Sequence, residues 1–224
     1  MKSLIFIAPP AAGKGTQSEI ISKKYNIPSI STGDLLRDAR NQDNEIGRII
    51  REKQDKGLLV DDEIVLNLLK NRLNESDCAN GYILDGFPRN TSQAIAYEKI
   101  LNELNKELGI VILLEAPKEL LMKRITGRIS CPKCKAVYNS LSDHMKPVKE
   151  GICNNCGTSL VRRSDDNEET FNQRFQTYID KTEPLINYYK EKGNLYKVDS
   201  TDKETATIMI EGLLNDEYKK WKRN

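Results

Sequence analysis

The start of the chain joins a short apolar stretch to a loop suited to binding phosphate. Residues 2–8 predict a buried strand, residues 9–13 a loop, and residues 14–25 a helix. The junction reads Gly13-Lys14-Gly15-Thr16, the end of a phosphate-binding loop in the strand–loop–helix setting that such a loop requires. Backbone N–H groups and the helix N-terminus can surround phosphate oxygens there, and the lysine can reach the terminal phosphates.

Strands and helices alternate along the rest of the chain. Further buried strands are predicted at 81–85, 110–115 and 195–198, with a short extended segment at 28–31. Helices are predicted at 33–57, from Asp61 onward, and at 90–105, 117–127, 168–192 and 203–221, with Thr32 as a cap and Pro184 as a kink or break. The continuous apolar run at 110–114 suits a parallel sheet covered on both faces. This alternation predicts an α/β fold built on a parallel sheet.

Four of the five cysteines form two C-x-x-C pairs, Cys131/Cys134 and Cys153/Cys156, separated by 18 residues. This spacing is typical of a zinc site in which four thiolates surround one ion. Redox dithiols or disulfides are the alternative. Cys78 has no partner nearby in sequence and is interpreted as an inert thiol.

Charge and hydropathy exclude some classes of function. Lys and Arg number 35 against 33 Asp and Glu, a net charge of +2, which argues against a general nucleic-acid binder. There is no apolar run of the roughly 18 residues that a membrane-spanning helix needs, and the first apolar stretch is too short for a secretory signal. A cytoplasmic location with no membrane or nucleic-acid partner is therefore expected, and a monomer is the default expectation.

Several segments resemble the signature segments of adenylate kinases. They are Ser31-Thr32-Gly33-Asp34-Leu35-Leu36-Arg37, Leu84-Asp85-Gly86-Phe87-Pro88-Arg89, Gly127-Arg128 and Arg163-Ser164-Asp165-Asp166, together with the phosphate loop. The four-cysteine insert is similar to the zinc-bearing lid of the long bacterial-type enzymes. The resemblance implies reversible conversion of ATP and AMP into two ADP. It also implies a P-loop NTPase-type core at 1–30, 61–126 and 165–224, a helical AMP-binding insert at 31–60 and a zinc lid at 127–164.

The same resemblance implies a set of site residues. Its catalytic group is Lys14, Arg89, Arg124, Arg163, Arg174 and Asp85, with Asp85 holding Mg²⁺ through water and Arg124, Arg163 and Arg174 converging on the transferred phosphoryl group. Its ATP-binding group is Ala11, Ala12, Gly13, Lys14, Gly15, Thr16, Arg128, Val137, Tyr138 and Asp202, with the Tyr138 ring available to pack on the base. Its AMP-binding group is Thr32, Arg37, Leu58, Leu59, Val60, Gly86, Phe87, Pro88, Arg89, Gln93, Arg163 and Arg174, with the Gln93 amide reading the base. Its metal ligands are Cys131, Cys134, Cys153 and Cys156, which hold a structural Zn²⁺.

The phosphate loop departs from the family pattern, which usually reads G-x-P-G-x-G-K-G-T. Ala8 and Ala11 replace the first two glycines. If Ala11 adopts a left-handed conformation, the strain costs about 1–2 kcal/mol. Alternatively, Pro9 and Pro10 reshape the loop so that no positive φ is needed. The sequence favours an active enzyme with weakened ATP binding.

Three other interpretations remain open at this stage. A kinase for UMP/CMP or GMP would share most motifs, although Gln93 and the long cysteine insert favour AMP. A zinc-ribbon nucleic-acid binder would need a more basic chain. A catalytically inactive relative is compatible with the two loop alanines.

Overall fold

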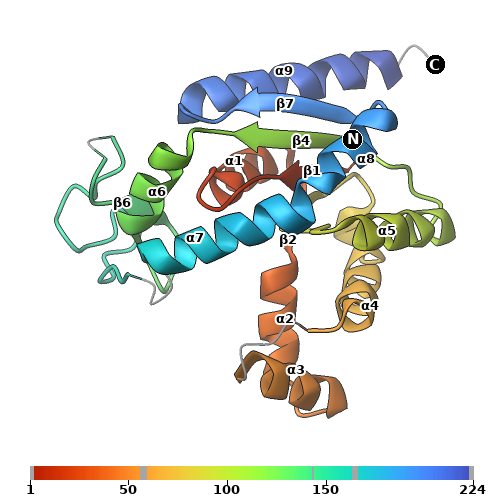
Figure 1. The fold of residues 1–224 in the computed structure, drawn as a ribbon, viewed down its shortest axis with the longest axis horizontal. Coiled ribbons are helices and arrows are strands. Elements are labelled where there is room, and N and C mark those ends of the chain that lie inside the picture. The colour runs from red at the N-terminus through yellow and green to blue at the C-terminus, as the bar shows by residue number, and fades with distance from the viewer. Residues whose placement is uncertain (1–2, 56–59, 143, 163–165, 222–224) are drawn as a thin grey trace.

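Five parallel strands form the central sheet of the computed structural model, which describes residues 3–55, 60–142, 144–162 and 166–221 (Figure 1). From one edge to the other their order is β2 (Ser29–Ser31), β3 (Ile83–Asp85), β1 (Leu4–Ile7), β4 (Ile110–Glu115) and β7 (Leu195–Asp199). Every neighbouring pair is parallel, so all five carboxyl ends meet at one edge of the sheet. The predicted parallel α/β architecture is confirmed.

Helices cover both faces of the sheet because its strands are apolar on both faces. Successive side chains of β1 point to opposite faces, with Ile5 and Ile7 in one core cluster and Leu4 and Phe6 in the other. The first cluster is closed by α4 (Asp62–Leu73), α5 (Thr91–Glu103) and α8 (Pro184–Glu191). The second is closed by α1 (Lys14–Tyr25), α6 (Lys118–Thr126), α7 (Glu168–Thr177) and α9 (Lys203–Trp221).

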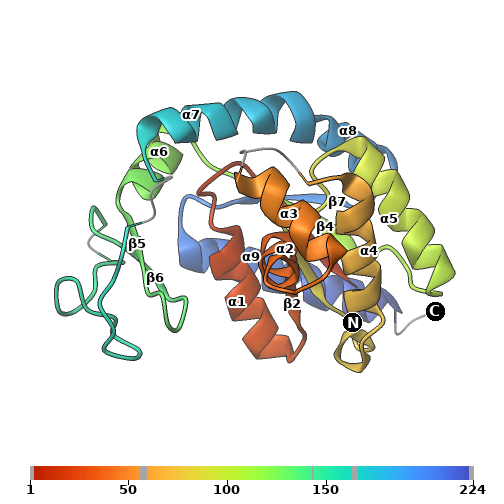
Figure 2. The same cartoon turned by 90° about the horizontal axis from the view of Figure 1, so that it is seen from below.

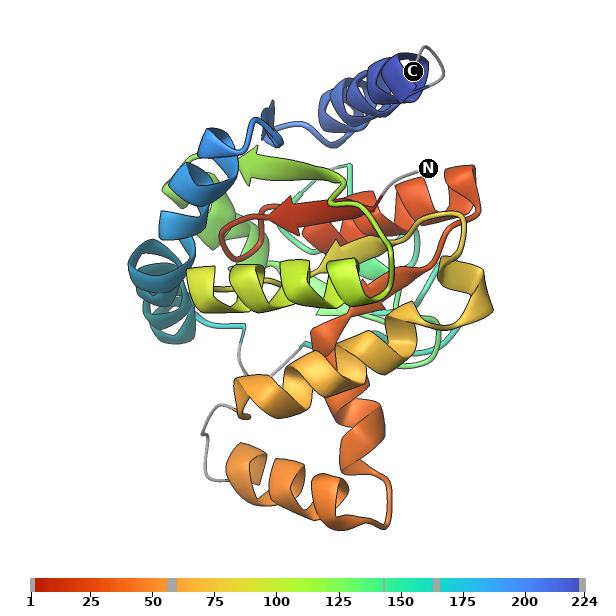
Figure 3. The same cartoon turned by 90° about the vertical axis from the view of Figure 1, so that its right-hand side faces the viewer.

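The prediction of one continuous helix at 33–57 is wrong. The structure has two helices, α2 (Thr32–Arg40) and α3 (Glu45–Asp55), joined by a turn. The turn forms because the Asn44 side chain accepts a hydrogen bond from the Gly47 N–H at 2.8 Å and starts α3. The predicted cap Thr32 is also wrong, since Ser31 caps α2 by accepting from the Asp34 N–H at 3.3 Å. Helices α2 and α3 stand away from the sheet, as the orange helices of Figure 3 show.

The predicted interruption near Pro184 is present. Helix α7 runs into a π-helical segment, Tyr178–Thr182, and α8 then begins with Pro184 at its first position. Proline is tolerated there because the N–H it lacks would have no partner inside the helix. The three pieces together run across the sheet from the cysteine-bearing side to α5 (Figure 2).

The cysteine-bearing segment has its own small sheet beside α6. Strands β5 (Arg128–Ser130) and β6 (Val137–Asn139) pair antiparallel, and a bridge joins Ser130 to Val161. The segment lies to one side of the main sheet, on the left of Figure 2. Among the described residues, no helix is long and apolar enough to cross a membrane.

Candidate functional site

The phosphate loop connects the carboxyl end of β1 to the N-terminus of α1. Gly13 has φ 93° at the N-cap position of α1, and Lys14 is the first helical residue. Ala11 has φ 63°, so the left-handed alternative for this alanine is the one that the structure adopts. Ala12 is buried against the sheet, and Gly15 and Thr16 follow Lys14 in the first turn. The positive end of the helix dipole therefore points at the loop.

Lys14 lies beside a carboxylate and within the field of three arginines. Its Nζ is 3.9 Å from Oδ1 of Asp85, which ends the adjacent strand β3. Burial lowers the pKa of Lys14, Asp85 opposes that shift, and the charges of Arg89, Arg174 and Arg128 lower the pKa further. Lys14 and three arginines from separate parts of the chain thus lie within electrostatic range of one another, and Asp85 is the carboxylate that acts on Lys14, so a polyanion there would relieve the mutual repulsion.

Arg89 is held by the loop after β3. Its Nε donates to the Gly86 carbonyl at 2.9 Å, and Thr182 Oγ1 donates to the Arg89 carbonyl at 3.0 Å. Desolvation and the charge of Arg174 lower the pKa of Arg89. Thr32 Oγ1 donates to the same Gly86 carbonyl at 3.3 Å. These two hydrogen bonds bring the N-terminus of α2 and the arginine to the same carbonyl. Gly86 has φ 80°, and the bond between Phe87 and Pro88 is cis.

Gln93 is held by hydrogen bonds at both ends of its side-chain amide. Its Oε1 accepts from the Arg89 backbone N–H at 2.8 Å, and its Nε2 donates to Asp62 Oδ1 at 2.6 Å. The residue is only 7% exposed. Sequence reasoning missed Asp62, since the acidic pair at the start of α4 indicates only a helix N-terminus. Asp62 and Gln93 are 31 residues apart, so no local pattern in the sequence indicates their contact.

Arg128 forms an ion pair across the base of the cysteine-bearing segment. Its Nε donates to Asp166 Oδ2 at 2.8 Å, and its Nη2 donates to the other carboxylate oxygen. The Asp166 side chain is fully buried, and that of Arg128 is 18% exposed. The pair joins the start of β5 to the chain just before α7.

Arg124 is held by backbone carbonyls of another part of the chain. Its Nη2 donates to the carbonyls of Ser200 and Thr201, each at 2.8 Å, in the loop after β7. These contacts fix one nitrogen of the guanidinium group, and the role of Arg124 at the phosphoryl group stays a prediction. Asp202, expected at the base of ATP, lies close enough to raise the pKa of Arg124, although burial lowers it more strongly.

The four predicted metal ligands come together. Cys131, Cys134, Cys153 and Cys156 are all free thiols whose sulfur atoms lie within 4.8 Å of one another. The Cys131–Cys156 and Cys134–Cys153 sulfur pairs are each 3.4 Å apart, too far for a disulfide bond. A tetrahedral zinc site places sulfur atoms about 3.8 Å apart. The arrangement therefore fits one ion better than two disulfides.

Tyr138 is part of the core of this segment. It is 8% exposed and clusters with Cys131 and Cys153. Its hydroxyl accepts from the Asn154 N–H at 2.8 Å and lies 3.4 Å from the Cys153 sulfur. The packing of its ring on a base stays a prediction, and the neighbouring Val137 is exposed.

Of five further residues that were predicted to bind AMP, the structure describes two. Arg37 pairs with Asp34 on the exposed side of α2, and Val60 packs beside the core near α4. Leu58, Leu59 and Arg163 lie outside the described residues.

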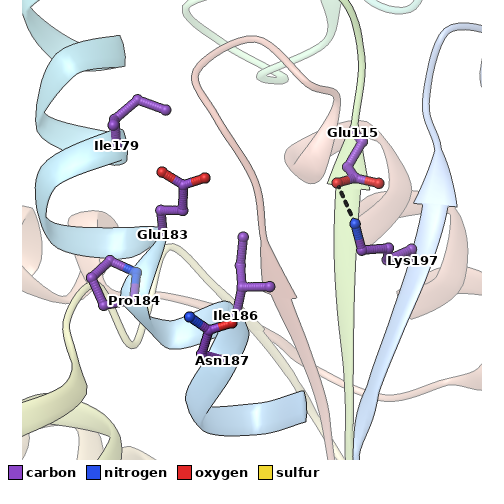
Figure 4. Close-up of a pocket in the computed structure, with 7 residues that line it drawn as sticks. All are labelled: Glu115, Ile179, Glu183, Pro184, Ile186, Asn187 and Lys197. Carbon is purple, nitrogen blue, oxygen red and sulfur yellow. Dashed lines mark hydrogen bonds and ion pairs between the residues drawn. The ribbon is translucent and has the colours of Figure 1, made fainter.

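A cavity of about 450 Å³ lies beside α8 (Figure 4). Its lining consists of Glu115, Ile179, Glu183, Pro184, Ile186, Asn187 and Lys197. None of these was predicted as a site residue. Glu115 and Lys197 pair with each other across adjacent strands at 3.0 Å.

Comparison with known proteins agrees with the motifs. The adenylate kinase family model matches residues 6–194. The chain belongs to the adenylate kinase family. It is 48% identical over 213 residues to an adenylate kinase of Archaeoglobus fulgidus, covering 95% of this chain and 97% of that protein. It is 47% identical to one of Caldicellulosiruptor bescii (86% of this chain, 88% of that protein) and 45% to one of Kosmotoga olearia (93% and 96%).

Membership makes this adenylate kinase a phosphotransferase of the nucleoside-monophosphate kinase class. The cation-rich region around Lys14 suits that chemistry, and the four-cysteine cluster suggests the subtype with a metal-bearing lid. The zinc-ribbon alternative is excluded by this assignment.

The first prediction concerns Ala11. We expect Ala11→Gly to raise the free energy of unfolding by about 0.5–1 kcal/mol, because glycine removes the left-handed strain but loses more entropy on folding. Denaturant unfolding measures this change. Ala8→Gly is the matched control, because Ala8 is not among the described residues with positive φ, and it should not stabilise the protein. The hypothesis that Ala11 weakens ATP binding also predicts a higher ATP affinity for Ala11→Gly. An unchanged ATP affinity would contradict that hypothesis.

The second prediction concerns the buried ion pair. Arg128→Ala leaves the Asp166 carboxylate buried without its partner, so we expect the free energy of unfolding to fall by about 3 kcal/mol. The double variant Arg128→Ala/Asp166→Ala should recover part of that loss. Arg48→Ala removes an exposed pair with Glu52 and should change stability by less than about 0.5 kcal/mol. Equal effects of the two arginine variants would refute the prediction.

Proposed function

We propose that this adenylate kinase transfers the terminal phosphoryl group of ATP to AMP reversibly and forms two ADP. The observation that carries the proposal is the group of four cations around Lys14 and Asp85, at the edge where the parallel strands end. Phosphoryl transfer needs positioning and charge neutralisation more than covalent participation by the protein. The family assignment supplies the nucleotide class.

Three of these cations have distinct proposed roles. Lys14 binds the terminal phosphates of ATP, because it extends from the helix that follows the phosphate loop. Arg89, bound to the loop after β3, holds the AMP phosphate. Arg174 on α7 acts on both Lys14 and Arg89, so it is placed to neutralise charge on the group that moves between the two nucleotides.

Mg²⁺ is the proposed partner of ATP. The carboxylate of Asp85 ends β3 next to Lys14 and supplies the oxygen chemistry that Mg²⁺ prefers. When bound, the ion neutralises charge on the phosphate oxygens. Lys14 and the arginines supply the remaining positive charge, and Asp85 keeps Lys14 oriented toward the loop.

Two parts of the chain are proposed to close over the nucleotides. The first is residues 31–60, whose helices α2 and α3 stand apart from the sheet, and the second is residues 127–164. Closure would exclude water, which otherwise competes with AMP for the phosphoryl group. We further propose that the enzyme acts as a monomer on free nucleotides in the cytoplasm.

Structural zinc is proposed for the cysteine cluster. Four thiolates fill a tetrahedral site and leave no position for a reactive water, so the ion has no part in the reaction. The segment around it has a minimal core of Cys131, Tyr138 and Cys153 with a few partly buried neighbours. Metal binding would therefore supply most of the free energy that keeps this segment folded.

The proposed activity is tested by measuring ADP formation from Mg·ATP with AMP, GMP, CMP or UMP at equal concentrations. We expect strong turnover with AMP alone. Lys14→Met should lower kcat with AMP by about 10³-fold, because a charge that neutralises the moving group is lost.

Lys23→Met is the matched control for that experiment. Lys23 lies on the same helix but pairs with Glu19 at an exposed position. Its replacement should leave kcat unchanged. Turnover with a different monophosphate would reassign the base pocket, and no turnover with any of them would favour an inactive relative.

Removal of the metal tests the zinc proposal. We expect about one zinc ion per chain, and a strong chelator should abolish protection from hydrogen exchange in residues 128–161 at temperatures where the central sheet stays protected. Cys134→Ser should have the same effect. Cys78→Ser is the control, since Cys78 is buried beside Arg72 and is not part of the cysteine cluster. The zinc content of this variant should equal that of the wild type. An exchange pattern that the chelator does not alter would contradict the proposal.

A further inference from the structure

The side-chain amide of Gln93 is clamped between two groups of opposite hydrogen-bonding character. Asp62 Oδ1, at the start of α4, accepts from Nε2 at 2.6 Å, and the Arg89 backbone N–H donates to Oε1 at 2.8 Å. The backbone of Gln93 is fixed as well, because its N–H donates to the Asn90 side chain at 2.8 Å at the N-terminus of α5. Position and orientation of this amide are therefore both set by its neighbours.

Neither neighbour can reverse its role. A carboxylate offers only acceptors, and a backbone N–H offers only a donor. If the Gln93 amide turned over, its oxygen would face the Asp62 carboxylate and its NH₂ group would face the Arg89 N–H. Both contacts would become repulsive in a site that is 7% exposed. Only one of the two amide orientations is thus compatible with this site.

One N–H of Nε2 and one lone pair of Oε1 remain available after these two bonds. Because the amide cannot turn over, the order in which this donor and this acceptor face a purine edge is fixed. Adenine offers an acceptor at N1 and a donor at its 6-amino group. Hypoxanthine and guanine offer a donor at N1 and an acceptor at O6. An amide that could turn over would match either edge, whereas a clamped amide matches one edge and opposes the other.

We propose that Asp62 is a specificity-determining positioning residue, which locks the Gln93 amide in the orientation that accepts adenine and rejects 6-oxopurines. This inference rests on the proposed function, in which Gln93 reads the AMP base. Asp62 acts through Gln93 and is not itself a catalytic residue. A purely structural role, in which Asp62 only ties α4 to α5, would weaken all monophosphates equally.

The test compares AMP with IMP, because these nucleotides differ only at the purine edge that the amide would read. The kcat/KM values for both are measured with Mg·ATP in the zinc-loaded full chain. Asp62→Ala should lower the AMP:IMP ratio at least about ten-fold, because a flipped amide then loses only one favourable contact. Asp62→Asn should lower the ratio in the same direction while keeping a hydrogen bond between α4 and α5, because an asparagine amide can turn over and pair with Gln93 in either orientation.

Asp61→Ala is the matched control. Asp61 is the adjacent acid and pairs with Lys53 at 2.5 Å, so its loss should leave the AMP:IMP ratio unchanged. If Asp62→Ala fails to fold, Asp62→Ser, whose side chain is too short to reach the amide, replaces it. An unchanged ratio in the Asp62 variant, or an equal fall for AMP and IMP, would overturn the inference.

Gln93→Ala separates this inference from the proposed function. If Gln93→Ala leaves the AMP:IMP ratio of the wild type intact, Gln93 does not read the base, and the proposed role of Gln93 fails. If Gln93→Ala removes the discrimination while Asp62→Ala retains it, the proposed function stands and only the role of Asp62 is overturned.

Discussion

Burial of positive charge at the carboxyl edge of the sheet is the constraint around which this structure is arranged. Burial lowers the pKa of both Lys14 and Arg89, the charge of Arg174 lowers both further, and Asp85 opposes both shifts. Such a group needs a rigid support. The support is a sheet buried on both faces, in which β1 and β3 end side by side and present Lys14 and Asp85 at one edge. The stability of the core is thus what allows an unfavourable charge distribution to persist until a polyanion binds.

Most of the sheet was predictable because its signals are local. The central strands β1, β3 and β4 each contain a short apolar run, and the sharp transition from β1 to Lys14 identifies the phosphate loop. The break between α2 and α3 was missed because polar residues continue across it, and the cap from Asn44 operates over only three residues. The interruption at Pro184 was found because proline acts through its own covalent geometry.

The site was less predictable than the fold because its contacts join distant positions. The cysteine cluster follows from spacing alone, whereas the partner of Gln93 lies on another helix and the partners of Arg124 are backbone carbonyls after β7. Backbone acceptors carry no mark in the sequence, so nothing distinguished Arg124 from an arginine that faces phosphate. The burial of Tyr138 was not predictable for a related reason. Motif position indicates that a residue is near the nucleotide, but not whether the small core of its own segment needs the ring.

The pairing of Arg128 with Asp166 also affects how the cysteine-bearing segment relates to its host. The two residues are 38 positions apart, yet they hold the entry and the exit of the segment together, and the bridge between Ser130 and Val161 does the same one step further in. The entropy of closing a loop depends on the chain between its fixed ends. For the rest of the protein, the link from α6 to α7 therefore behaves as a short connection, whatever the length of the segment that the Arg128–Asp166 pair closes off. An insert attached in this way is a module that can lengthen, shorten or change its internal stabilisation without altering how the host domain folds.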